Sequence, residues 1–324
     1  MKLGIISVAH MHAYSYADAI RKIEGVQLAG VADEDVARGK AAAEKWGVPF
    51  YQDCRELLAS DVDAVIITSE NAKHHEHAVA AANAGKHILC EKPLATTEAA
   101  AREMIEICRE QGVILQTAFP VRFHPAVVRA KQLVDQGKVG RIMAIRGTNR
   151  GQNPGGWFID REKSGGGAVI DHTVHVADLM RWFMGSEVRE VYAEVDSKFS
   201  DSAIDDCGIL TMEFENSVFA TLDCSWSRNK SFPVWGDVTM EIVGTEGTLS
   251  LDVFSQKLDL YSEDKGLKWV NWGDDMDTQL IKDFVASVRE RKTPSVTGED
   301  GLRAVEVALA AYQSAQQKQP VTLR

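Results

Sequence analysis

Two groups of ionisable side chains have the types and spacing that acid–base chemistry requires. Lys92 stands in the segment Glu91-Lys92-Pro93, directly after an apolar run, so we expect it at the end of a buried strand. Asp171 and His175 are four residues apart, which places them on one face of a helix. Histidine titrates near neutral pH and suits proton transfer to a hydroxyl group. The alternatives are a solvated lysine and a histidine bonded to an aspartate in the core.

The first turn of the chain lacks the glycines of a dinucleotide site. The usual fingerprint is G-x-G-x-x-G between a strand and a helix, and here residues 7–12 occupy that place. The three glycines are replaced by Ser7, Ala9 and His12. Serine and alanine are small enough for the backbone to approach a pyrophosphate, and a helix N-terminus still offers N–H groups. We expect His10 and His12 to donate hydrogen bonds beside the pyrophosphate.

Asp33 follows the second apolar run, where an acidic residue accepts hydrogen bonds from the adenosine ribose hydroxyls. Asp33 and the adjacent Glu34 would repel a 2′-phosphate. No arginine follows immediately, since Arg38 lies a helical turn further on. The sequence therefore favours NAD over NADP, the alternative being an exposed turn aspartate.

The elements that hold these residues alternate between strand and helix in the first third of the chain. Continuous apolar runs predict strands at 3–8, 26–33, 63–68, 87–92 and 113–119, with a short extended piece at 49–51. Helices are predicted at 13–24, 34–46, 53–59, 72–84 and 96–111. This alternation predicts a doubly wound parallel sheet, whose ligands bind at the carboxyl ends of the strands.

The pattern changes after residue 120. Helices are predicted at 125–136, 168–184, 276–291 and 299–317. Between them lie a strand at 141–150 and, from residue 187 to 262, runs with partial alternation that are typical of antiparallel strands. We predict an α/β protein with a Rossmann domain at 1–120 and an α+β domain at 121–324. The second domain should carry a large, mostly antiparallel open sheet, and the substrate should bind between the domains.

Three motifs resemble the Gfo/Idh/MocA oxidoreductases, a family named for glucose–fructose oxidoreductase and inositol dehydrogenase. AAANAGKHILCEKPLATT (80–97) is close to the family's A-G-K-H-V-x-x-E-K-P signature. SGGGAVIDHTVHVADLMRWFMG (164–185) matches its G-G-G-x-x-x-D-x-G-x-H-x-x-D pattern, and IVGTEGTLSLD (242–252) is a third match. The resemblance covers essentially the whole chain.

The resemblance implies an NAD-dependent dehydrogenase or reductase of a sugar, cyclitol or related polyol. Lys92 would contact the nicotinamide and polarise the substrate oxygen, Asp171 would orient the group, and His175 would take the hydroxyl proton. The expected cofactor-binding residues, from the strand ends and the resemblance together, are Ser7, Ala9, His10, Met11, His12, Asp33, Thr68, Ser69, Asn71, His74, Glu91, Lys92 and Gln116. Besides the lost glycines, Glu70 stands where the family usually has proline, and Thr173 replaces a glycine.

Substrate contacts are expected from aromatic and polar residues near the predicted catalytic groups. Sugars pack their apolar faces on aromatic rings, which favours Trp157 in the loop before the three glycines. Arg122 and His124, after the domain junction, and His172, beside Asp171, are further candidates. The Lys92-Pro93 bond is a candidate for the cis form.

Three rival functions remain open on the sequence. His10 and His12 resemble the opening motif of metal-dependent amidohydrolases, but the antiparallel second half does not fit an eightfold barrel, and we expect no metal. A non-catalytic NAD-binding regulator would not need Lys92 and His175. A redox-cycling glycosidase or lyase keeps the same fold and cofactor.

Composition narrows the class of protein. The 324 residues carry a formal net charge of -11 and no Lys/Arg cluster, which disfavours nucleic-acid and anionic membrane partners. Five scattered cysteines and the absence of a predicted leader or span favour a cytoplasmic protein. The resemblance and an open sheet face indicate a homodimer or homotetramer.

Overall fold

The computed structural model describes residues 1–264 and 266–323. The chain forms two compact units. The first consists of residues 1–120, 162–165 and 276–302, and the second of residues 121–161, 166–275 and 303–324. The first unit thus includes a helix from late in the sequence. Each unit is described by itself below.

The first unit is built on a six-stranded parallel sheet. Its strands are β1 (Lys2–Ile6), β2 (Gln27–Ala32), β3 (Phe50–Tyr51), β4 (Ala64–Ile67), β5 (His87–Glu91) and β6 (Leu115–Ala118). They run in the order β3-β2-β1-β4-β5-β6. The order reverses between β1 and β4, which is the switch point where doubly wound sheets bind ligands. The predicted parallel sheet is confirmed.

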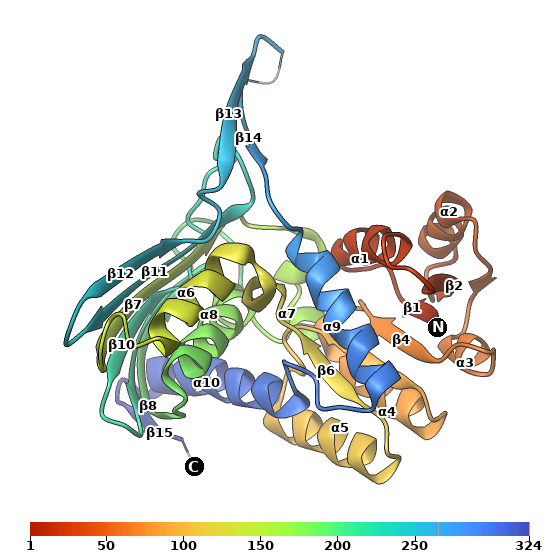
Figure 1. Ribbon diagram of the computed structural model, residues 1–324, viewed down its shortest axis with the longest axis horizontal. Helices are drawn as coiled ribbons and strands as arrows, with labels where there is room; N and C mark the ends of the chain where they lie inside the picture. Colours follow the sequence, from red (N-terminus) through yellow and green to blue (C-terminus); the bar gives the residue numbers. More distant parts are fainter. Residues whose placement is uncertain (265, 324) are drawn as a thin grey trace. The chain divides into compact units, whose positions relative to one another are not determined.

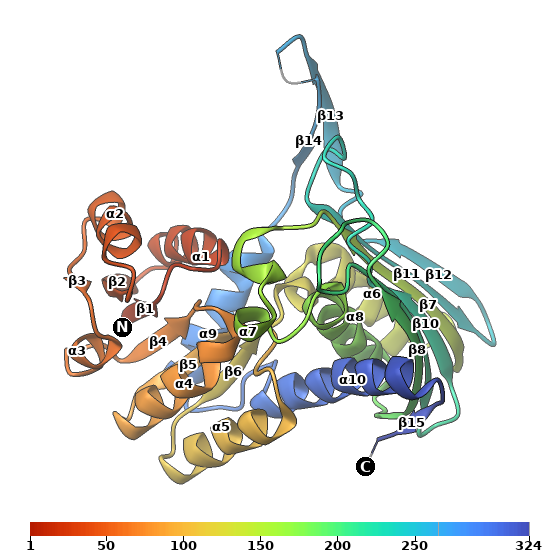
Figure 2. The same ribbon diagram turned by 180° about the vertical axis from the view of Figure 1, so that it is seen from behind.

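Helices cover both faces of this sheet because successive crossovers run in opposite directions from the switch point. They are α1 (His12–Arg21), α2 (Val36–Trp46), α3 (Cys54–Leu58), α4 (His74–Asn83), α5 (Glu98–Glu110) and α9 (Met276–Glu290). Helix α1 packs against α9 and α4 against α5, as Figures 1 and 2 show for the two faces. The short helix η1 (Asn71–Lys73) leads into α4. With both faces covered, β1, β4 and β5 are almost wholly buried, which explains their unbroken apolar sequences.

The second unit contains a seven-stranded mixed sheet. Its strands are β7 (Ile142–Gly151), β8 (Val188–Asp196), β9 (Cys207–Phe214), β10 (Phe219–Asp223), β11 (Gly236–Gly244), β12 (Thr248–Asp252) and β15 (Val321–Thr322). The order is β12-β11-β7-β10-β9-β8-β15. Only β7 and β10 pair in parallel among the pairs described, so the sheet is mostly antiparallel, as predicted.

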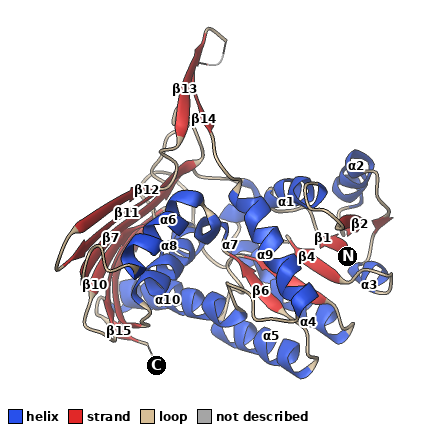
Figure 3. Ribbon diagram, viewed as in Figure 1, coloured by secondary structure: helices blue, strands red, loops and turns tan. Residues whose placement is uncertain are grey.

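Helices cover one face of this sheet and leave the other open. In Figure 3, α6 (Pro125–Asp135), α8 (Ala168–Met184) and the later part of α10 (Gly298–Gln317) lie on the same side. Alternate residues of the strands face away from these helices, and their exposed apolar members are Tyr192, Ile209, Phe219 and Val243. Shorter elements of the chain are η2 (Pro120–Phe123), η3 (Gly156–Ile159) and α7 (Arg161–Ser164).

A separate hairpin of β13 (Lys257–Ser262) and β14 (Gly266–Asn271) projects beyond the end of the seven-stranded sheet. Strand β13 was predicted and β14 was not. Both faces of the hairpin are largely exposed, so β14 lacks the one-sided burial that produces a clear alternating pattern.

The start of α8 is held by one buried carboxylate. Asp205 accepts hydrogen bonds from the N–H groups of Gly167 (2.8 Å) and Val169 (2.9 Å), and its carbonyl accepts from Ala168 (3.0 Å). The Tyr312 hydroxyl donates to Asp205 at 3.0 Å. A Cβ at Gly167 would overlap the Asp205 carbonyl. Glycine is therefore required at this position because the backbone of Asp205 passes too close for a side chain.

Replacing Asp205 by alanine should lower the free energy of unfolding by about 2 kcal/mol, because N–H groups at the start of α8 lose their acceptor and stay buried. The midpoint of urea unfolding, followed by tryptophan fluorescence, measures this. Asp201→Ala, at an exposed position in the same loop, is the control and should change stability by less than about 0.5 kcal/mol. Equal midpoints for the two variants would contradict the capping role.

Candidate cofactor and active site

The turn after β1 keeps the backbone path of a dinucleotide site without its glycines. Ser7 has a φ of 64°, in the left-handed region that favours glycine. Its N–H donates to Ala32 at 2.6 Å, and its carbonyl accepts from the Thr68 hydroxyl at 2.6 Å. Bonds to β2 and to the end of β4 thus hold a serine in a conformation that costs a non-glycine residue roughly 1 kcal/mol.

Most backbone N–H groups of this turn already donate to acceptors within the protein, and that of Met11 is the exception among the described residues. Four donate to internal acceptors: Val8 to Asp33 Oδ2 (2.7 Å), Ala9 to Ser7 Oγ (3.2 Å), His10 to the Thr68 carbonyl (2.9 Å) and His12 to His10 Nδ1 (3.1 Å). In the usual motif such groups point at the pyrophosphate. Side chains must therefore supply part of the attraction for an anion here.

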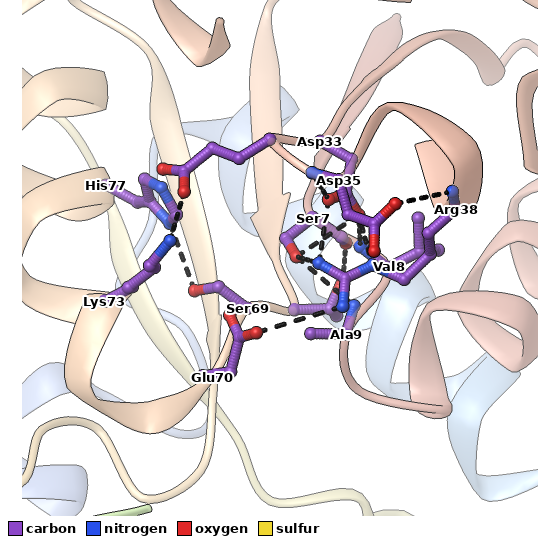
Figure 4. A network of polar contacts seen from close by, with 12 residues as sticks. Ser7, Val8, Ala9, Asp33, Asp35, Arg38, Ser69, Glu70, Lys73 and His77 are labelled. Carbon is purple, nitrogen blue, oxygen red and sulfur yellow. Dashed lines mark hydrogen bonds and ion pairs between the residues drawn. The ribbon is translucent and has the colours of Figure 1, made fainter. Parts of the chain in front are cut away.

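Asp33 is paired with Arg38, which lies a helical turn further along the chain. Arg38 donates from Nε to Asp33 Oδ2 (2.9 Å) and from Nη2 to Asp33 Oδ1 (2.8 Å), and Asp33 also accepts from the N–H groups of Val8 and Asp35. Figure 4 shows this network. The Asp33 side chain is fully buried, whereas that of Arg38 is 31% exposed. A ribose hydroxyl would thus share a carboxylate that Arg38 already neutralises.

Acidic side chains surround Arg38. Glu70 lies 3.8 Å from its guanidinium, and Asp35 caps α2 by accepting from the Arg38 N–H at 3.0 Å. Asp33, by hydrogen bonding, raises the pKa of Arg38 against the opposing effect of burial. Glu34 pairs with Lys73 at an exposed position. The surroundings of Arg38 therefore carry more acidic than basic groups.

Glu91 is the centre of a buried polar cluster at the end of β5. His12 Nδ1 lies 2.9 Å from Glu91 Oε1, and the Tyr16 hydroxyl donates to the same oxygen in a short bond. The N–H of Lys92 donates to Glu91 Oε2 at 3.1 Å. The side chain of Glu91 is fully buried, and that of His12 is 28% exposed. Helix α1 is thereby tied to β5, across the switch point of the sheet.

Electrostatics make Glu91 an anion and favour the charged form of His12. Burial alone would raise the pKa of Glu91, but the imidazoles of His12 and His10 outweigh it and hold that pKa below its usual range. Burial likewise opposes a charge on His12, yet the Glu91 carboxylate raises the pKa of His12 above its ordinary value. For Tyr16, burial and Glu91 both raise the pKa. The cluster therefore joins an ionised carboxylate to an imidazole whose protonated form it favours, and the tyrosine hydroxyl keeps its proton.

His10, His12 and Glu91 also resemble a set of metal ligands. One nitrogen or oxygen of each lies within 4.8 Å of the others. However, Nδ1 of His10 accepts from the His12 N–H, so the ring proton of neutral His10 lies on Nε2. Nδ1 of His12 is engaged with Glu91. This arrangement favours a hydrogen-bonded network over metal coordination.

The residues around Lys92 position the end of β5. The Lys92-Pro93 peptide is cis, which confirms that prediction, and Lys92 is buried. His74 Nδ1 lies 2.9 Å from the Pro93 carbonyl, and burial lowers the pKa of His74. Asn71 donates to the Ser164 carbonyl at 2.9 Å. His74 and Asn71, which were expected to line the cofactor, thus make internal bonds near the predicted catalytic lysine.

Most of the other predicted cofactor residues of this unit lie at the carboxyl ends of the strands, and Gln116 does not. Ser69 is buried, and its hydroxyl lies 3.0 Å from His77 Nδ1. Gln116, on β6, donates to Asp283 of α9 at 3.3 Å. Met11, within the turn at residues 7–12, is 62% exposed. Ser7, Ala9, His10, His12, Thr68, Glu91 and Lys92 come together at the carboxyl ends of β1, β4 and β5, whereas Gln116 turns toward α9.

In the second unit, Asp171 and His175 lie one turn apart on α8, and both are buried. Trp226 Nε1 donates to Asp171 Oδ2 at 3.2 Å, and His172 Nε2 lies 3.4 Å from the same oxygen. His172 Nδ1 lies 3.2 Å from the Cys224 carbonyl. Trp226 and His172 therefore fix the orientation of the Asp171 carboxylate.

The predicted substrate residues have structural partners. Arg122 makes a bidentate, buried ion pair with Asp178 of α8 (2.5 and 2.6 Å). His124 caps α6 by accepting from the Ala126 N–H at 3.2 Å, and burial lowers its pKa. Trp157 stacks on Phe158 with the ring centroids 3.9 Å apart. Their role toward a substrate stays a prediction.

Sequence reasoning missed Tyr16 and Trp226 as members of these clusters. Tyr16 follows His12 by four residues on α1, and this helical spacing was a usable signal. Trp226 lies 55 residues from Asp171, and no local pattern connects them. Trp226 is buried, and its indole N–H donates to the predicted catalytic aspartate.

Two models of known protein families match successive parts of the chain. Residues 1–119 match the model described as "Oxidoreductase family, NAD-binding Rossmann fold", and residues 127–250 match the "GFO/IDH/MocA C-terminal domain". No helix in the described part of the chain is long and apolar enough to cross a membrane.

Individual relatives match along the whole length. The chain is 31% identical to "Uncharacterized oxidoreductase YrbE" of Bacillus subtilis (94% of this chain, 91% of the relative). It is 29% identical to "Myo-inositol 2-dehydrogenase" of Thermotoga maritima (100% and 98%). Among solved structures, scyllo-inositol dehydrogenase from Lactobacillus casei "with bound cofactor NAD(H) and scyllo-inositol" aligns with a TM-score of 0.86 at 26% identity (99% and 98%). The chain belongs to the Gfo/Idh/MocA family of oxidoreductases, and its first unit is that family's NAD-binding Rossmann domain.

Proposed function

We propose that this protein is an NAD-dependent dehydrogenase or reductase that acts on a secondary hydroxyl, or the matching ketone, of a sugar, cyclitol or related polyol. The observation that carries the proposal is the likeness to inositol dehydrogenases along the whole chain. The presence of Lys92, Asp171 and His175 in the matching motifs supports catalysis over a purely regulatory role.

The first unit fits a dinucleotide in topology and in local backbone. The 3-2-1-4-5-6 strand order puts a switch point beside the turn at residues 7–12. Ser7 retains the left-handed conformation, and the small side chain of Ala9 lets a ligand approach the backbone. When bound, NAD supplies the acceptor for the hydride that leaves the substrate carbon.

Three residues of this chain would carry the acid–base work. We assign Lys92 to donate a hydrogen bond to the reacting oxygen, which stabilises negative charge there. His175 would accept the hydroxyl proton during oxidation and return it during reduction. Asp171, oriented by Trp226 and His172, would hold a neighbouring substrate hydroxyl.

Substrate recognition is assigned to side chains near α8. The stacked pair of Trp157 and Phe158 offers an aromatic face to the apolar side of a sugar ring. His172 and His124 are polar candidates for hydroxyl groups. Arg122 would contact the substrate directly. It would also position α8 through its ion pair with Asp178.

We further propose that NAD is preferred over NADP. Asp33, Glu34, Asp35 and Glu70 give the region an acidic character that disfavours a 2′-phosphate. Arg38 weakens this discrimination because it neutralises Asp33 and is partly exposed. The preference should therefore be moderate rather than absolute.

A homodimer or homotetramer is proposed through the open face of the seven-stranded sheet. Ile209 and Phe219 are each 59% exposed on that face, and Tyr192 and Val243 extend the apolar surface. A second copy of the chain would remove these side chains from water.

With NAD and a panel of inositols and sugars, the wild-type protein should produce NADH, followed by absorbance. Lys92→Ala and His175→Ala should each lower kcat by at least about 100-fold, because each removes a group that acts on the reacting oxygen or its proton. Binding of NAD, measured by calorimetry, should persist in both variants.

Lys40→Ala and His75→Ala are matched controls at exposed or half-exposed positions, and both should retain full turnover. Undiminished turnover in the Lys92 and His175 variants would refute the assigned roles. Cleavage of a glycoside without net NADH would favour the redox-cycling glycosidase or lyase instead.

Arg38→Ala should increase the NAD-to-NADP ratio of kcat/KM by about tenfold, because Asp33 then meets a 2′-phosphate without its compensating cation. Steady-state kinetics with both cofactors measures the ratio. Arg55→Ala, which changes an exposed arginine of the same unit, should leave it unchanged. Equal use of NADP by the wild type would contradict the preference itself.

Phe219→Glu should dissociate the oligomer, because a buried, unpaired carboxylate is unfavourable in a subunit interface. Light scattering coupled to size exclusion should give a dimer or tetramer for the wild type and a monomer for the variant. Phe199→Glu, at an exposed phenylalanine outside the strands, is the control. A wild-type monomer would reject the proposed interface.

A further inference from the structure

The turn at residues 7–12 leaves few backbone N–H groups for a ligand. Its N–H groups at Val8, Ala9, His10 and His12 donate to acceptors of the protein itself. A pyrophosphate brought to this turn still requires donors or positive charge. Side chains near the turn must therefore supply part of these donors or of this charge.

His12 is placed to be that group. It is the first residue of α1, and it stands where the usual motif has its third glycine. Its Nδ1 faces Glu91 at 2.9 Å, so Nε2 is the nitrogen left for a ligand, and it has no hydrogen-bond partner among residues 1–264 and 266–323. The side chain is 28% exposed, while Glu91 behind it is wholly buried.

We propose that His12, held by the buried Glu91 carboxylate, binds the pyrophosphate of the dinucleotide through Nε2–H, and so supplies a donor that most backbone N–H groups of this turn no longer offer. The inference rests on the NAD-binding role of the first unit but not on any particular substrate. The imidazolium of His12 attracts the phosphates, and Glu91 stabilises that charge and fixes the ring. His12 thereby makes dinucleotide affinity dependent on pH.

The charges that face His12 decide the direction of this dependence. Burial and Lys92 disfavour its protonated form, whereas Glu91 on β5 and Asp277 on α9 favour it, with the result that the pKa of His12 is raised. His10 packs edge-on at 4.3 Å between ring centroids, and the Tyr16 hydroxyl lies 3.5 Å from His12 Nδ1. The protonated form exists below this raised pKa, so affinity should be high at mildly acidic pH and fall as pH rises through neutrality.

Calorimetric titration of the full-length protein between pH 6 and 9, without substrate, tests the proposal. The Kd for NAD should rise about tenfold across this range in the wild type, which corresponds to ~1.4 kcal/mol. ADP-ribose, which keeps the pyrophosphate and lacks nicotinamide, should show the same rise. Adenosine, which carries no phosphate, should show none.

Variants separate the role of His12 from that of the fold. His12→Asn should bind NAD with a Kd that does not depend on pH and that equals the wild-type value at pH 9. Glu91→Gln should move the transition to lower pH, because the imidazolium loses its counter-charge. His75→Asn removes a surface histidine whose Nε2 also lies 2.9 Å from a carboxylate, that of Glu103, and it should behave as wild type. Thermal melting verifies that each variant is folded.

A direct readout of the imidazole completes the test. In NMR titration, the His12 resonance should show a pKa that increases further when ADP-ribose binds. A pH-independent Kd in the wild type, or an unchanged pH profile in folded His12→Asn, would overturn the proposal. A pH effect seen with NAD but not with ADP-ribose would move His12 to the nicotinamide end and would also overturn it. Wild-type protein that binds no dinucleotide at any pH would instead reject the proposed function.

Discussion

A buried carboxylate must be compensated by hydrogen bonds or by a cation, and this constraint determines how the elements of the site are positioned. Glu91 is compensated by His12 and Tyr16, so α1 is fixed to the end of β5. Asp205 is compensated by the first N–H groups of α8, so the helix that bears Asp171 and His175 begins at a defined residue. In each unit, the charge that is costly to bury also orients the predicted chemistry.

The same constraint explains why charged residues of the site have two roles. Asp33 and Arg38 satisfy each other, yet Arg38 remains partly exposed at the expected adenosine end of the site. Asp178 is buried against Arg122, so it anchors α8 rather than offering a carboxylate to a ligand. Truncating one partner of such a pair would leave a buried charge, and the resulting loss of stability would exceed the value of the contact itself. Activity measurements on these positions therefore need a parallel measurement of folding.

Much of the fold could be predicted because it depends on local sequence. The unbroken apolar runs that become β1, β4 and β5 are buried on both sides, so each strand is visible in the sequence. Helix α8 was predicted with the bounds it has, because apolar residues fill it and a glycine ends it. Strand β14, which belongs to a hairpin exposed on both faces, was missed for the opposite reason. The contacts within the site could not be predicted, because they join distant segments: His12 and Glu91 are 79 residues apart in the chain.

The turn at residues 7–12 has a residue in the left-handed conformation typical of glycine and yet lacks the glycines of the usual motif. Ser7 occupies the left-handed conformation without being glycine, so the turn keeps its shape at a cost that hydrogen bonds from Thr68 and to Ala32 help to offset. Once the Ser7 hydroxyl accepts from Ala9 and the Asp33 carboxylate accepts from Val8, the turn is rigid but has fewer N–H groups for an anion. A backbone N–H has no pKa in the physiological range, whereas an imidazole does. Under the proposed binding by His12, the turn therefore acquires a dependence on pH that the glycine motif lacks, and the buried Glu91 influences where on the pH scale that dependence falls.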